Sequence, residues 1–293
     1  MKRSRIVYFL FLFSGITALI YEVVWTRMLT LAFGHTVFSV SIVLASFMAG
    51  LGFGSYFSGH AIDHIGGKKT QSDSSSLSKE FSEDLETSSL LLIYGWIEVA
   101  LFLLCLIVSL ILFKFSVIYS WFSFFVPESI VVQNIFKSFL AFILMFIPAS
   151  LMGATLPIIS QYYITDNIKL DARLGLLYGI NTLGAAFGCL LAGFFLIANF
   201  GVLQTVLSAT VLNLFVGISA IRIYQESLES SKGLHFPRFT IPKISWEGDQ
   251  WLWIVVSFVC GFTALSYEVL WTRLLIFSTS STVYSFSMML GVF

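Results

Sequence analysis

The sequence of 293 residues contains few charges. Asp, Glu, Lys and Arg make up 11% of it, and the 16 acidic and 16 basic residues cancel. An ordinary soluble domain is about 25% charged, and a nucleic-acid-binding domain carries a basic stripe. The composition therefore excludes the first class and disfavours nucleic-acid binding. Apolar residues instead make up 57% of the chain, with 31 Phe, which is typical of a protein in a lipid bilayer.

Cysteine is also scarce. The three cysteines, Cys105, Cys189 and Cys260, stand far apart, each inside an apolar run. This spacing indicates neither a disulfide framework nor a CxxC metal site. We therefore expect no metal site and interpret the cysteines as small apolar packing residues.

Long apolar runs are the main feature that is present. A bilayer core of about 30 Å needs roughly 20 helical residues. Runs of this length cover residues 6–32, 36–58, 89–113, 132–163, 173–197, 201–223 and 251–277. The sequence thus predicts an all-α, polytopic membrane helix bundle. A further run begins near Thr282 and stops at Phe293, too short to cross, so we expect a truncated chain.

Basic residues indicate the orientation of the bundle. Most Lys and Arg fall on the side of the N-terminus, whereas Arg27, Lys114, Lys137 and Arg273 fall toward the other side. By the positive-inside rule this predicts a cytoplasmic N-terminus in the cell inner (plasma) membrane. The basic N-terminus also resembles a secretory signal, but no small-residue cleavage site follows it.

Three segments between the spans differ from them. Residues 70–88 are serine-rich and acidic, which predicts a flexible cytoplasmic loop. Residues 224–249 have two prolines and mixed charge, which is typical of a linker. Residues 115–128 are aromatic and predict an interfacial helix on the outer side. We therefore divide the chain into a six-span repeat over 1–223, a cytoplasmic linker over 224–249, and the start of a second repeat over 250–293.

The division depends on an internal repeat. GITALIYEVVWTR begins at Gly15, and GFTALSYEVLWTR begins at Gly261. Six spans separate the copies, so the halves should be parallel repeats about an axis along the membrane normal. The shared positions that carry polar or aromatic chemistry are Tyr21 and Tyr267, Glu22 and Glu268, Trp25 and Trp271, and Arg27 and Arg273.

A short motif after the second span adds to this pattern. In GHAIDHIGGKK, the residues Gly59, Asp63, Gly66 and Lys68 are similar to the loop signature of the major facilitator superfamily. Glycines permit a tight turn there, and an aspartate can meet a helix N-terminus or a basic side chain. A plain polar turn between helices is the alternative.

The combined motifs resemble a narrower family. With PASLMGATLPIIS and RLGLLYGINTLGAAFGCLLAGF in later spans, the chain looks like the membrane portion of fused major facilitator superfamily transporter and spermidine-synthase-like proteins. The resemblance implies a transporter region that handles polyamines or related small amines. It also leaves two alternatives: a membrane anchor for a polyamine aminopropyltransferase, or a non-transporting scaffold.

The same resemblance implies a soluble synthase-like domain, covalently joined or associated. These residues contain no glycine-rich strand-turn-helix for S-adenosylmethionine. An S-adenosylmethionine-type ligand would therefore bind only in that absent domain, and we assign no catalytic residue and no cofactor to this chain.

The repeated glutamate and arginine raise the question of partners. Glu22 and Arg27 are five residues apart, about 140° around a helix, so they cannot pair with each other. We expect Glu22 to face Arg273 and Glu268 to face Arg27, or both glutamates to face a cavity. A structural clamp, a substrate or proton role, and interfacial anchoring remain open. The neighbouring Tyr and Trp side chains either join this site or form an aromatic packing stripe.

Glu98 is a third carboxylate at membrane depth. It either carries a proton or pairs with Arg173 or Lys169.

Small residues mark the fifth span. Gly175, Gly179, Gly184 and Gly188 stand four apart in two pairs, which favours close helix packing. We expect a sliding interface with the other half, with Asn181 bonding across helices or contacting substrate.

Overall fold

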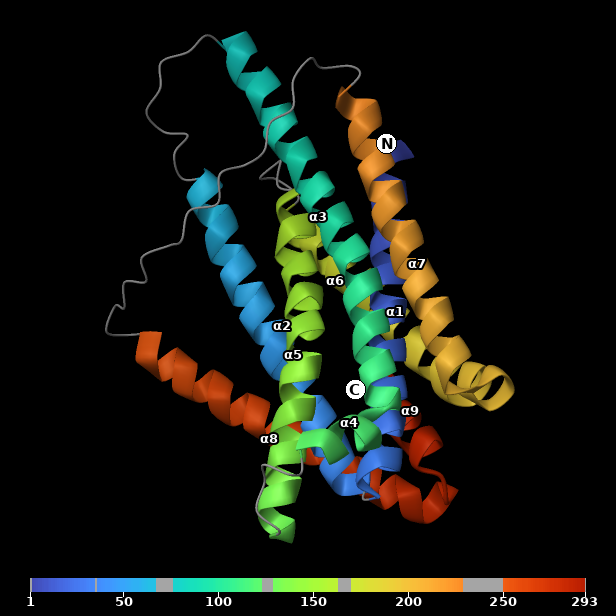
Figure 1. The fold of residues 1–293 in the computed structure, drawn as a ribbon. Helices are drawn as coiled ribbons and strands as arrows, with labels where there is room; N and C mark the ends of the chain where they lie inside the picture. The colour runs from blue at the N-terminus through green and yellow to red at the C-terminus, as the bar shows by residue number, and fades with distance from the viewer. Residues whose placement is uncertain are drawn as a thin grey trace.

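The computed structural model describes residues 2–34, 36–66, 76–122, 129–162, 170–228 and 250–292. These residues form helices joined by short turns, and no strand occurs among them (Figure 1). The elements are α1 (Lys2–Phe33), α2 (Thr36–Gly66), α3 (Ser76–Phe113), α4 (Phe115–Phe122), α5 (Ile130–Tyr162), α6 (Leu170–Leu190), the π-helix η4 (Leu191–Leu196), α7 (Ile197–Leu228), α8 (Gln250–Thr279) and α9 (Thr282–Val292). The prediction of an all-α architecture is confirmed.

Six helical stretches of the described chain are long and apolar enough to cross a membrane. One of them, Arg173–Glu226, has 54 residues, which at 1.5 Å per residue is far longer than a 30 Å core. Its backbone breaks at Gly201 (φ 79°, ψ 172°), and α6 and α7 run in opposite directions on either side (Figure 1). This stretch therefore contains two of the expected spans, and the helices fit a multi-pass membrane protein.

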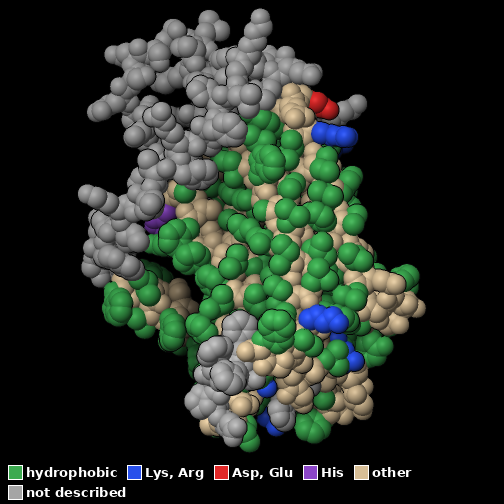
Figure 2. Space-filling view, viewed as in Figure 1, with side chains coloured by type: hydrophobic (Ala, Val, Ile, Leu, Met, Phe, Trp, Pro, Cys, Tyr) green, Lys and Arg blue, Asp and Glu red, His purple; other side chains and the backbone are tan. Residues whose placement is uncertain are grey.

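The helices of the first half pack around α1. This helix contacts α2, α6 and α7, while α5 packs against α2 and α3, and α3 packs against α7. The core is apolar and aromatic, with Tyr21, Trp25 and Phe47 fully or almost fully buried. Hydrophobic side chains also lie over much of the described part of the visible outer face (Figure 2). An apolar core within an apolar exterior is the arrangement that a bilayer stabilises.

Helix α8 has different surroundings, although it repeats the sequence of α1. It crosses obliquely at one end of the bundle (Figure 1). Only 6% of the residues in its apolar central segment are buried, against 61% in the corresponding segment of α1. Helix α9 follows after a short turn and packs against α1, α6 and η4. The second copy of the repeat thus contacts the first half mainly through α9 and the C-terminal part of α8.

Several expectations about the connecting segments change. Helix α3 begins at Ser76, so residues 76–88 are helical rather than a loop. Gly59 lies inside α2, so this glycine of the loop motif does not make a turn. Gly66 is the last residue of the helix. The Asp63 side chain and Lys68 lie outside the described residues. The interfacial segment is helical over α4. Most of the expected linker, from residue 229 to 249, lies outside the described chain.

Candidate functional site

The two copies of the repeat share their local geometry. Thr26 donates a hydrogen bond to the backbone carbonyl of Glu22 (2.8 Å). The equivalent Thr272 donates to the carbonyl of Glu268 (2.9 Å). In both copies two residues separate the first helix from the next one, which begins at Thr36 (α2) in the first copy and at Thr282 (α9) in the second. The two copies therefore have the same local structure from the repeated glutamate to the beginning of the next helix.

Glu22 and Glu268 are the repeated carboxylates, and the structure places both in the interior, within electrostatic range of each other. Their exposed fractions are 2% and 4%, and the two side chains interact electrostatically. Oε1 of Glu22 has no hydrogen-bond partner among the described residues. Two like-charged groups that meet in a buried position repel each other when both are ionised, so this junction favours a bound cation or proton.

The expected pairing of each glutamate with the opposite arginine is wrong. Within the described chain, neither glutamate has an arginine within salt-bridge distance. Arg27 is half-buried and Arg273 is exposed. Each arginine follows its glutamate by five residues, so it points to a different side of the helix. The alternative, in which the two glutamates face a common region, agrees with their positions.

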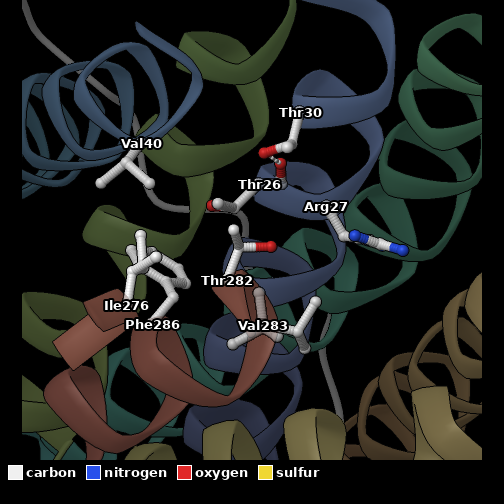
Figure 3. A pocket seen from close by; sticks show the side chains of 9 residues that line it. Thr26, Arg27, Thr30, Val40, Ile276, Thr282, Val283 and Phe286 are labelled. Carbon is white, nitrogen blue, oxygen red and sulfur yellow. Dashed lines mark hydrogen bonds between the residues drawn. The ribbon is translucent and has the colours of Figure 1, made fainter. Parts of the chain in front are cut away.

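A small pocket lies about one helical turn from Glu22, between the copies. It is lined by Val23, Thr26, Arg27 and Thr30 of α1, Val40 of α2, Ile276 of α8, and Thr282, Val283 and Phe286 of α9. Thr30 and Ile276 are equivalent in the repeat, as are Val40 and Phe286. The Arg27 guanidinium is directed away from the other labelled side chains (Figure 3). The pocket walls therefore consist of methyl, methylene and ring carbons with three threonine hydroxyls.

The aromatic residues of the repeat differ between the copies. Tyr21 and Trp25 stack with ring centroids 5.5 Å apart, and both are completely buried. Trp25 Nε1 donates to Ser109 Oγ of α3 (2.8 Å). The equivalent Tyr267 and Trp271 are 55% and 49% exposed. In the first copy these side chains therefore stack and bond to α7 and α3 rather than to Glu22 or Arg27, which agrees with the aromatic packing stripe.

Glu98 lies in a second polar cluster, inside the first half. Its side chain has no exposed area, and Nδ2 of Asn213 in α7 donates to its Oε2 (3.0 Å). The Tyr21 hydroxyl in turn lies 3.4 Å from Oδ1 of Asn213. The partner of Glu98 is thus an amide, not Arg173; Lys169 lies outside the described residues. The prediction of an ion pair with Arg173 is wrong.

Sequence reasoning missed Asn213 and Ser109, the partners of Glu98 and Trp25. Both are uncharged residues within apolar runs, and they attract little notice beside glutamate and arginine. Their positions carry a signal nonetheless, because a polar side chain in a membrane helix usually bonds to another helix.

Two of the predicted glycines of the fifth span, Gly184 and Gly188, pack on α1 rather than on the second half. A Cβ atom added to Gly184 would meet the carbonyl of Leu12, and one added to Gly188 would meet the carbonyl of Ile16. Asn181 lies against Gly15 in the same interface. Gly175 and Gly179 have open space around them. Close approach therefore involves only the C-terminal pair of these glycines, and both helices belong to the same half.

The π-helix η4 joins this interface to α9. Cys189 just before it contacts the backbone carbonyl of Ser287 in α9 (3.4 Å), and Gly193 within it lies against the Ser287 side chain. π-Helical turns inside α-helices are frequent at functional sites. Here the wider turn lies where α9 of the second copy contacts the first half.

The described residues contain no group of three or more His, Cys, Asp or Glu side chains that could hold a metal ion. Comparisons with known protein families, curated proteins and solved structures found no match. The case for a function therefore depends on the residues and their geometry.

Proposed function

We propose that the chain forms the membrane-spanning region of a small-molecule transporter of major facilitator type, in which Glu22 and Glu268 bind a cationic amine such as a polyamine. The observation that carries this proposal is the burial of the two carboxylates within electrostatic range of each other. They come from equivalent positions of duplicated helices, are almost fully buried, and have no basic partner among the described residues.

Burial explains why such a pair suggests a ligand. Ionisable residues inside a membrane are costly and are kept mainly for binding, proton transfer or pairing. Pairing with arginine is absent for both glutamates in the described chain. A bound ammonium group would supply the missing positive charge and hydrogen-bond donors.

The adjacent pocket has room for about one water-sized group. Its aliphatic and aromatic walls suit one methylene group of an amine rather than a whole chain, and the hydroxyls of Thr26 and Thr30 donate to backbone carbonyls. Arg27 lines the pocket but its guanidinium is turned away (Figure 3), so the positive charge lies away from the ligand position. Symmetry adds support, since transporters with parallel repeats place their substrate sites where the repeats meet.

The link to a soluble synthase-like domain rests on the sequence resemblance alone. In that arrangement the membrane helices would deliver or collect an amine for the enzyme. A bundle that only anchors an enzyme, or that only serves as a scaffold, would have no need of a substrate site at the repeat junction.

Transport by the purified chain in liposomes tests the proposal. We expect saturable uptake of radiolabelled spermidine, with at least a tenfold loss in Glu22→Gln and in Glu268→Gln. The control Glu226→Gln changes an exposed carboxylate at the end of α7 and should leave uptake unchanged. A folded chain that neither transports nor binds spermidine would contradict the proposal, and would favour the anchor.

A further inference from the structure

A second carboxylate site lies inside the first half, apart from the repeat junction. Glu98 of α3 is completely buried between α1 and α7. Its Oε2 accepts a hydrogen bond from Asn213 of α7 (3.0 Å), whereas Oε1 has no hydrogen-bond partner among the described residues. One oxygen therefore accepts a hydrogen bond from an amide, and the other is buried without one, with the Ser14 and Tyr94 hydroxyls beside the carboxyl group.

The groups around Glu98 supply no positive charge. From α1 the hydroxyls of Ser14 and Tyr21 face the cluster, and from α3 itself come Tyr94 and the Cys105 thiol. Helix α7 adds only the neutral amide of Asn213. All these titratable neighbours are acids that are neutral when protonated, and none can balance a carboxylate charge.

The hydrogen bonds of the neighbours also define what Oε1 can do. The Tyr94 hydroxyl donates to the backbone carbonyl of Leu10 (3.4 Å), so its proton is directed away from Glu98 while its oxygen remains an acceptor. Ser14 also lies beside the carboxyl group and offers a second hydroxyl oxygen. A proton on Oε1 could therefore be donated to a hydroxyl oxygen within the cluster.

We propose that Glu98 is a proton-binding site at the junction of α1, α3 and α7, with Asn213 as its fixed hydrogen-bond donor. Binding converts the carboxylate and a proton from water into a neutral carboxylic acid. Release returns the proton and leaves a buried negative charge whose neighbours are the amide of Asn213 and the neutral hydroxyls of Ser14 and Tyr94. Because an unpaired charge in the interior is costly, release must accompany a rearrangement of α1, α3 and α7 that admits water or a cation.

This site does not depend on the proposed transport of amines. It involves none of the pocket residues, and it would hold equally in a protein that moves another substrate. Helix α1 contributes to both sites. Tyr21 faces the Glu98 cluster, and the next residue, Glu22, belongs to the carboxylate pair with Glu268.

Infrared spectroscopy of the full chain in lipid nanodiscs tests the site. A protonated carboxylic acid has a carbonyl stretching band that shifts in deuterium oxide. The spectrum of the wild type minus that of Glu98→Gln should contain one such band at neutral pH. The band should disappear reversibly at alkaline pH while the helices stay intact. Glu226→Gln should not change it, since that side chain is exposed.

A second variant keeps the test decisive if Glu98→Gln fails to fold. Asn213→Ala removes the donor to Oε2 and should shift the frequency of the band without abolishing it. Absence of the band at neutral pH would overturn the proposal, because Glu98 would then be ionised. A band that persists to the alkaline limit of folding would also overturn it, since the proton would never leave. A spectrum unaltered by Asn213→Ala would place the protonated group elsewhere.

Discussion

Gly34 and Ser280 occupy equivalent positions after α1 and α8, and both have a left-handed backbone, with φ of 71° and 53°. The amide of Gly34 donates to the carbonyl of Thr30 (3.0 Å), and that of Ser280 donates to the carbonyl of Ile276 (2.9 Å). The two copies therefore end their first helix in the same way, although only the first has the glycine that favours this conformation.

This difference predicts a stabilising substitution. Ser280→Gly should raise the free energy of unfolding by about 1 kcal/mol, because the left-handed region costs an L-residue roughly that much. Thermal unfolding in detergent micelles would measure the change. The reverse substitution in the first copy, Gly34→Ser, should lower stability by a similar amount. Equal effects of the same sign in both variants would contradict the interpretation.

The sequence predicted the helices well, because span length and apolar content depend only on neighbouring residues. It also identified Glu22, Glu98 and Glu268 as the buried acids. It failed on their partners. Helical spacing fixes the angle between Glu22 and Arg27, but it does not reveal which helix lies opposite each side chain.

The same limit explains the missed cluster around Glu98. Asn213 is 115 residues from Glu98 along the chain, and only the packing of α3 on α7 brings them together. The glycine faces show the limit again, since Gly175 and Gly184 look alike in sequence but only the latter lies against another helix.

Trp25 and Trp271 offer a matched pair for testing the hydrogen bond to Ser109. Trp25→Phe should lower the free energy of unfolding by about 1–2 kcal/mol, because it removes the bond from Nε1 to Ser109 Oγ and part of a fully buried ring. Trp271→Phe should have little effect, since its side chain is 49% exposed. Chemical unfolding in micelles would compare the two.

A double-mutant cycle separates the hydrogen bond from the packing of the indole. Once Ser109→Ala is present, Trp25→Phe should cost about 0.5–1 kcal/mol less than in the wild-type background. Identical costs in both backgrounds would show that the bond contributes nothing to stability.

The interface between α1 and α6 should distinguish its glycines. Gly188→Ala should destabilise the protein by about 1–3 kcal/mol, because the new methyl group would meet the backbone of Ile16. Gly179→Ala should be neutral or slightly stabilising, since open space surrounds it and alanine favours helix. Unfolding of both variants under the same conditions would check this, and equal losses would argue against the packing.

Gly201 should be sensitive to substitution because of its backbone conformation. Its φ of 79° and ψ of 172° lie in a region that is almost exclusive to glycine, and other residues there cost about 1–3 kcal/mol. It breaks the helical stretch where the chain reverses from α6 to α7 (Figure 1). Gly201→Ala should therefore lower the unfolding temperature. Gly261→Ala is the control, because this glycine has open space and no positive φ. If Gly201→Ala proved as stable as that control, the backbone break would have no structural importance.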